Sequence, residues 1–273
     1  MEWRKAREYI IWLLLAVNIV LFCTNLYRAN DTVVSAGRIA DVTSVLKSRG
    51  ITLDCTLPNK YRPMAQLYTQ NHSYDYIKLQ NLFMSGKSDI KRTERYNSVV
   101  FTSGNSSLVI RGGSIEYVDT LSSAFDSPEA AAAYCGTIAD NINSLFGDYE
   151  FYSSEAVDGG YSVKYYSKYN NRNVFSNFLY FTVKGELLNI ALNYSDIQES
   201  SGRRSIKGSD EAVFAAADSI LSDHPEGCLI SDVEQGYYDS QLSSSDENYA
   251  LPCYIIRAGG GEYFVNAYTG EML

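Results

Sequence analysis

The run from Tyr9 to Tyr27, in which no residue is charged, constrains this chain more than any other feature of its sequence. A helix of roughly 20 apolar residues crosses the ~30 Å hydrocarbon layer of a membrane, and this run nearly reaches that length. Aromatic residues stand near both ends of the run, as they do at membrane interfaces: Trp3, Tyr9, Trp12 and Tyr27. The run therefore predicts a transmembrane helix over 9–27 after a cytoplasmic tail over 1–8.

The charges that flank this run predict its orientation. Three basic residues precede it, at Arg4, Lys5 and Arg7, whereas Arg28 and Asp31 nearly cancel after it. The excess of basic residues keeps the N-terminus in the cytoplasm and predicts a single-pass protein of the cell membrane whose C-terminal part is extracytoplasmic. A cleaved signal peptide is the alternative, since small residues at 34–36 would suit signal peptidase. The apolar run is longer than a signal core, so we prefer an uncleaved anchor.

Asn18 is a strongly polar side chain in the middle of the apolar run. An amide at this depth of a membrane can hydrogen-bond to a second helix. The residues one turn before and after Asn18 would complete such a packing face: Leu14, Leu15, Leu21 and Phe22. We expect this face to pack against a partner's membrane helix, with simple tolerance of a lone Asn as the alternative.

Composition limits what the part after the run can bind. The formal net charge of the chain is −9, and such a surface repels phosphate backbones, so nucleic acid is excluded as a partner. The 23 tyrosines favour half-buried strands that keep the hydroxyl at the rim. We therefore expect an ectodomain rich in β-sheet.

Cap and turn signals divide this ectodomain into three portions. The first, 28–125, combines helices with β-hairpins. The second, 126–205, begins with the helix start Ser127-Pro128-Glu129 and continues with four strands. The third, 206–273, repeats this order with a shorter helix, capped by Ser209-Asp210-Glu211, and three strands. The predicted fold class is α+β: an N-terminal transmembrane helix, then two related units, each a helix plus an antiparallel β-meander.

The cysteines form no metal-binding pattern. Cys55, Cys135, Cys228 and Cys253 are widely spaced and include no Cys-x-x-Cys pair. An oxidising exterior permits disulfides, and Cys228 and Cys253 are predicted on adjacent strands. This pair is the candidate disulfide.

No segment carries a recognisable motif for catalysis or cofactor binding. The only histidines, His72 and His224, occupy positions that suit ordinary surface residues. A basic stretch, with Lys87, Lys91, Arg92 and Arg95, is interpreted as a solvated loop and not as a binding patch. We expect a protein without catalytic residues, cofactor or metal. Carboxylates that converge in the fold would leave a glycosidase as an alternative.

Several segments resemble the YycI family, regulatory proteins of Gram-positive bacteria that accompany the essential cell-wall sensor kinase called YycG or WalK. They are Met1-Glu-Trp-Arg-Lys-Ala-Arg7, Val45-Leu-Lys-Ser-Arg-Gly-Ile51 followed by Leu57-Pro58, Val99-Val-Phe101 with the 107–119 hairpin, and Tyr263-Phe-Val-Asn-Ala-Tyr-Thr-Gly-Glu271. The last segment also resembles the strand ending of PepSY-type domains. The resemblance follows nearly the whole chain in order and length, and it is most specific at the start and the end.

The resemblance implies a non-enzymatic, membrane-anchored regulator with no catalytic residues to carry over. Its ectodomain would bind a YycH-like protein and, with it, modulate a sensor histidine kinase of the YycG/WalK type. Membrane lipid would contact the single helix. The alternatives are a PepSY-like ligand-binding or protease-inhibiting protein and a cell-wall hydrolase.

Overall fold

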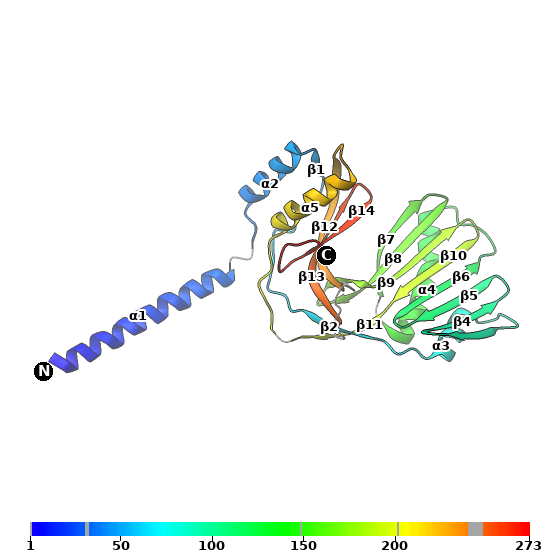
Figure 1. Cartoon of the computed structure of the whole chain (residues 1–273), viewed down its shortest axis with the longest axis horizontal. Coiled ribbons are helices and arrows are strands. Elements are labelled where there is room, and N and C mark those ends of the chain that lie inside the picture. The colour runs from blue at the N-terminus through cyan, green and yellow to red at the C-terminus, as the bar shows by residue number, and fades with distance from the viewer. Residues whose placement is uncertain (1, 31–32, 148, 201, 240–247) are drawn as a thin grey trace.

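The structure, a computed structural model, describes residues 2–30, 33–147, 149–200, 202–239 and 248–273 (Figure 1). Within them the helices are α1 (Glu2–Asn30), α2 (Ala36–Ser48), α3 (Tyr76–Phe83), α4 (Pro128–Phe146) and α5 (Ser209–Asp223). The strands are β1 (Ile51–Leu53), β2 (Leu67–Asn71), β3 (Lys91–Arg95), β4 (Ser98–Ser103), β5 (Ser106–Arg111), β6 (Ser114–Thr120), β7 (Tyr149–Val157), β8 (Gly160–Tyr169), β9 (Arg172–Lys184), β10 (Leu187–Asn193), β11 (Ser195–Glu199), β12 (Cys228–Asp239), β13 (Asn248–Ala258) and β14 (Gly261–Asn266).

Helix α1 extends alone, away from the rest of the chain (Figure 1). Measured over the described residues, no helix combines the length and the apolar character that crossing a membrane requires. This finding contradicts the predicted transmembrane helix over 9–27 and the single-pass localisation in the cell membrane that depended on it.

The five residues predicted to form a packing face lie on α1 and remain largely exposed. Asn18 satisfies its amide within the helix, because Nδ2 donates to the carbonyl of Leu14 at 2.9 Å. Exposed fractions of about half or more are found for the other members of the face: Leu14, Leu15, Leu21 and Phe22.

The described strands form one connected 14-stranded sheet, which contradicts the prediction of two separate helix-plus-meander units. Its main order is β11-β2-β13-β12-β9-β10-β6-β5-β4-β3, with β1 beside β12, β14 beside β13, and β7 joined through β8 to β9. Strand β10 pairs antiparallel with β6, and β12 pairs in parallel with β9. The strands thereby bury edges that isolated meanders would leave unpaired, and the fold is mixed α/β around a large sheet.

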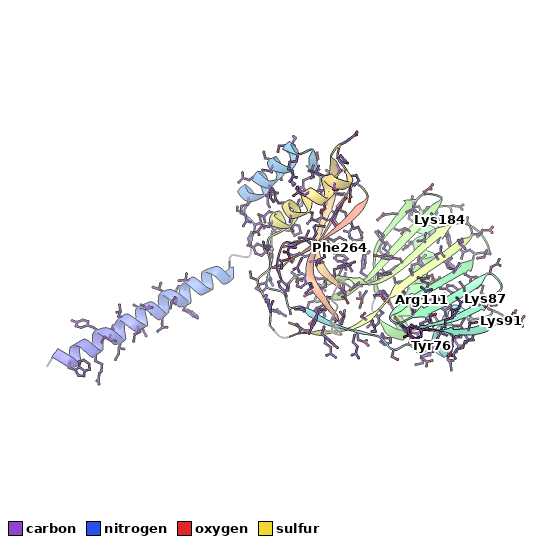
Figure 2. All side chains as sticks on the ribbon, viewed as in Figure 1. Tyr76, Lys87, Lys91, Arg111, Lys184 and Phe264 are labelled. Carbon is purple, nitrogen blue, oxygen red and sulfur yellow. The ribbon has the colours of Figure 1, made fainter. Side chains whose placement is uncertain are left out.

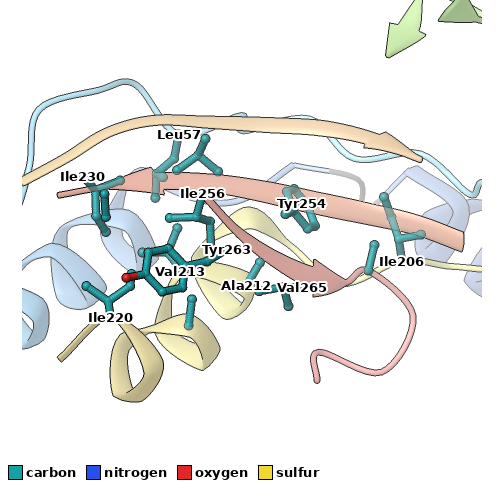
Figure 3. Close-up of a cluster of buried hydrophobic side chains, with 14 of the residues drawn as sticks. Leu57, Ile206, Ala212, Val213, Ile220, Ile230, Tyr254, Ile256, Tyr263 and Val265 are labelled. Atoms are coloured by element: carbon teal, nitrogen blue, oxygen red, sulfur yellow. The ribbon is translucent and has the colours of Figure 1, made fainter. Parts of the chain in front are cut away.

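Two helical layers cover different parts of this sheet. Helix α4 presents Ala131, Cys135, Ala139 and Ile142 at helical spacing to strands β7–β9, and all four are buried. Helix α5 covers β12–β14 at the other end, and α2 packs against α5 and β1. Figure 3 shows this second core, in which residues such as Val213 and Ile220 of α5 meet Ile256 and Val265 of the strands.

A third cluster lies where the two parts of the sheet meet. Tyr166, Phe175, Cys253 and Ile255 are its buried members, and half-buried residues surround them: Tyr152, Phe178, Tyr180, Tyr238, Phe264 and Leu273. The backbone contact between the two parts is short, because β9 and β12 share only the pairs Asn173–Gly236 and Val174–Tyr237. Side chains therefore carry much of this contact, which we call the junction.

The local signals differ in how well they predict helix starts and strands. Helix α4 is confirmed: the side chain of Ser127 accepts a hydrogen bond from the Ala130 amide at 3.2 Å, and Pro128 opens the helix. At α5 the prediction is wrong, because Gly208 is the cap residue and Ser209 instead donates to the carbonyl of Pro58 at 2.7 Å. Of the basic stretch predicted as a loop, Lys91, Arg92 and Arg95 belong to strand β3, whereas Lys87 lies outside any helix or strand.

The predicted disulfide is also wrong, because Cys228 and Cys253 are both free thiols. Cys228 is the first residue of β12, whereas Cys253 of β13 pairs with Gly236, far along the same strand. At about 3.3 Å per residue, the two cysteines lie on the order of 25 Å apart, and a disulfide requires less than about 7 Å between Cα atoms.

Candidate partner-binding pocket between α2 and α5

Helices α2 and α5 lie side by side, α5 over β12–β14 and α2 against β1, and define the candidate site (Figure 1). The cap residue Ser35 starts α2 by accepting a hydrogen bond from the Arg38 amide at 3.3 Å. Helix α5 buries Ala212, Val213 and Ala216 in the core, so its opposite side faces the solvent. The two helices are therefore fixed in place by the core beneath them.

Ion pairs join the two helices along their exposed side. A guanidinium nitrogen of Arg38 lies 2.6 Å from Asp210 and 3.0 Å from Glu211. The hydrogen bond to Glu211 and the charge of Asp210 raise the pKa of Arg38. Arg49 bonds Asp218 further along the pair, and Lys207 lies 3.6 Å from Glu211.

A pocket of about 450 Å³ opens beside these ion pairs. Its lining comes from α2, α5 and the segments next to them: Arg38, Asp41, Val42, Lys207, Asp210, Glu211, Phe214, Ala215 and Gly270. Pockets of roughly 300–1,000 Å³ with an apolar wall and a few polar groups are typical of binding sites. Phe214 is 50% exposed, an unusual position for a large aromatic side chain on a helix that otherwise buries its apolar face.

Asp210 contributes a buried carboxylate to the lining of this pocket. The residue is buried, and although its Oδ2 atom meets Arg38, its Oδ1 atom has no hydrogen-bond partner among the described residues. A buried acceptor without a donor costs about 1–3 kcal/mol. The site thus combines an exposed aromatic ring, apolar walls and a buried carboxylate held by Arg38.

The histidines singled out in the sequence lie away from this pocket and from each other. His72 places Nδ1 3.1 Å from both carboxylate oxygens of Asp196, and its ring meets Tyr74 and Tyr194 edge-on. His224 caps the C-terminal end of α5. Across the described parts of the chain, no group of three or more His, Cys, Asp and Glu side chains is arranged to hold a metal ion.

The sequence contained one usable signal for the pocket. Phe214 stands between buried Val213 and the half-buried Ala215, out of phase with the apolar stripe of α5. Asp210 and Glu211 were interpreted as part of a helix cap, which concealed their contact with Arg38 of a distant helix. Nothing in the local sequence around Arg38 indicates that partner.

Comparison with known proteins shows the fold. No family model matches the chain, and no curated protein matches it either. The solved structure of an uncharacterized protein from Eubacterium rectale is 13% identical and has a TM-score of 0.52, covering 82% of this chain and 89% of that one. The C-terminal domain of YpeB from Bacillus megaterium is 10% identical with a TM-score of 0.43, covering 74% of this chain and 96% of that domain. The chain thus shares its fold with the Eubacterium protein, while the YycI resemblance depends on the sequence motifs alone.

Proposed function

We propose that this chain is a non-enzymatic regulatory protein that binds another protein through the pocket between α2 and α5. The observation that supports this most is Phe214, half exposed at a pocket whose rim is ordered by the Arg38 ion pairs. Exposed aromatic and arginine side chains at a preformed pocket are the residue types that dominate binding energy at protein interfaces.

The proposed partner is a YycH-like protein, as the resemblance of the sequence motifs implies. An apolar side chain of the partner would lie against Phe214, Val42 and Ala215. Binding that favours one arrangement of the complex would in turn bias a sensor histidine kinase of the YycG/WalK type, because a ligand shifts an equilibrium by its difference in affinity for the two states.

Co-purification with the YycH-like protein tests the proposal. We expect Phe214→Ala to weaken the complex about tenfold or more, which corresponds to loss of one interface anchor. Phe151→Ala is the matched control, because Phe151 is 55% exposed on β7, away from α2 and α5. Equal affinities of the Phe214→Ala variant and the wild-type chain, with unchanged circular dichroism, would refute the site.

The absence of an enzymatic role is tested separately with the two histidines. A double variant, His72→Gln and His224→Gln, should retain both complex formation and kinase regulation. Loss of regulation at a normal protein level would argue for a proton-transfer role and against the proposal.

A further inference from the structure

Strand β3 forms one end of the main strand order and pairs only with β4 among the described strands. All five of its residues are exposed. The backbone groups on its outer side therefore have no partner strand, which makes this edge a template for another extended chain. Charged residues on such an edge normally prevent its pairing with further copies of itself.

The charges of β3 are divided unequally between its two faces. Alternation along the strand places Lys91, Thr93 and Arg95 on one face. On the other face Arg92 already has two partners. It lies 2.6 Å from Glu94, and its guanidinium lies 5.7 Å from the ring centre of Tyr76. Lys91 and Arg95 have no carboxylate partner among the described residues. One face thus presents unpaired positive charge in a chain whose net charge is −9.

A third basic residue and the exposed ring of Tyr96 extend this surface at the end of the strand, while Tyr76 lies by Arg92 on the other face. Ser98 pairs with Arg95, and the register between β4 and β5 brings Arg111 next to Ser98, so both arginines project from one sheet face. A cavity of about 790 Å³ lies at this end and is lined by Tyr76, Glu94, Arg95, Tyr96, Asn97, Ser98, Val99, Ile110, Arg111 and Gly112. Tyr96 is 97% exposed. Figure 2 shows Tyr76 and Arg111 at this end of the strand, with Lys91 toward its other end.

We propose that the free edge of β3 binds an extended acidic peptide segment of another protein by strand addition. The added strand would complete the backbone hydrogen bonds of β3. Acidic side chains at alternate positions of the peptide share one face, so they would meet Lys91 and Arg95. Arg111 and the ring of Tyr96 would hold the end of the segment. A second β3 strand is a poor occupant because it would bring like charges together. This edge lies apart from α2 and α5, so the inference does not depend on the proposed function.

Fluorescence anisotropy with a short labelled peptide that alternates Glu and Thr tests this site on the full chain. We expect saturable binding that weakens as salt is added, because exposed charge contacts are screened. The double variant Lys91→Glu, Arg95→Glu should bind about tenfold more weakly or worse. The control Arg62→Glu, Lys184→Glu changes the net charge equally at residues outside β3–β6 and should bind like wild type.

A backbone-blocked peptide separates strand addition from simple charge attraction. The same peptide N-methylated at alternate residues keeps its carboxylates but cannot pair along one side, and we expect it to bind at least about tenfold more weakly. Equal binding of both peptides would overturn strand addition and indicate a general polyanion surface. Equal loss in the control variant would overturn the assignment to β3. Far-ultraviolet circular dichroism and the milder variant Lys91→Gln, Arg95→Gln test whether misfolding causes the weaker binding of the charge-reversal variant.

Discussion

The guanidinium of Arg257 on β13 lies 4.9 Å from the ring centre of Tyr152 on β7 and so bridges the two parts of the sheet. The hydroxyl of Tyr152 donates to Glu234 of β12 at 3.1 Å, and Arg257 itself lies 3.2 Å from Glu262 and 3.6 Å from Glu234. It also pairs with Asp232. This network stands at the junction, where only two backbone pairs connect β9 with β12.

Replacing Arg257 should therefore destabilise the fold. Its side chain is 16% exposed, and burial would lower its pKa, but Tyr152 and the surrounding carboxylates raise it instead. Arg257→Leu leaves these carboxylates without a cation and should reduce the free energy of unfolding by about 2 kcal/mol or more. Arg257→Lys keeps the charge and should lose less. Urea denaturation of both variants measures the difference, and equal stabilities of the leucine and lysine variants would contradict the role given to the charge.

Glu234 should make the junction more stable in acid. Burial raises the pKa of its carboxyl above the ordinary value of 4.5, against the opposing effects of Tyr152 and Arg257. Because the folded state holds this proton more tightly than the unfolded chain, the stabilising contribution is complete below pH 4.5 and is lost as the pH rises through the folded-state pKa. The free energy of unfolding of wild type relative to Glu234→Gln should therefore increase on acidification. A pH-independent difference between the two would refute this role of Glu234.

Asp119 should have the opposite pH dependence. Burial acts to raise its pKa, but hydrogen bonds from Lys87, Ser106 and Tyr117 lower it to about 2 from the ordinary 3.8. Its contribution to stability is present above pH 3.8 and is lost as the pH falls through about 2. Asp119→Asn should cost about 2 kcal/mol at neutral pH, and this cost should vanish in acid. A cost that persists unchanged at pH 2 would show that geometry, and not charge, makes the contribution.

Asn177 should be costly to replace because it completes backbone hydrogen bonds where the chain turns from β10 into β11. The side chain is fully buried, its Nδ2 donates to the carbonyl of Ser195 at 2.8 Å, and its Oδ1 accepts from the Ser195 amide at 3.1 Å. Asn177→Ala should reduce the free energy of unfolding by about 2–4 kcal/mol, since both backbone groups lose their partner. Asn189→Ala on the half-exposed face of β10 is the control and should cost far less.

Local elements of this fold were predictable where one short segment contains the whole signal. The start of α4 is an example, because Ser127 and Pro128 act on the next few residues only. The start of α5 was misassigned because Ser209 bonds Pro58, a residue far away in sequence. Strand β3 was missed because an exposed edge strand needs no apolar alternation, and its basic residues look like those of a loop.

The connected sheet and the candidate pocket could not be predicted from the sequence, because both depend on contacts between segments that are distant in sequence. The parallel contact between β9 and β12 consists of two residue pairs, and neither strand shows a pattern that specifies it. Likewise the meeting of Arg38 with Asp210 joins two helices that are distant in sequence. Such contacts depend on tertiary packing, so local sequence propensities do not predict them.

The strand order also determines when each part of the sheet can be completed during synthesis. Strands β3 to β10 are contiguous in sequence and pair among themselves, so a ribosome that has released residue 193 has supplied all of their partners except β12, which joins β9 later. Strands β1 and β2 are made earlier but pair with β12, β13 and β11, which emerge later. Strands β1 and β2 therefore remain without their partner strands while the middle of the chain folds. A nascent chain of this kind exposes its earliest strand segments longest, and these are the segments on which a chaperone would act.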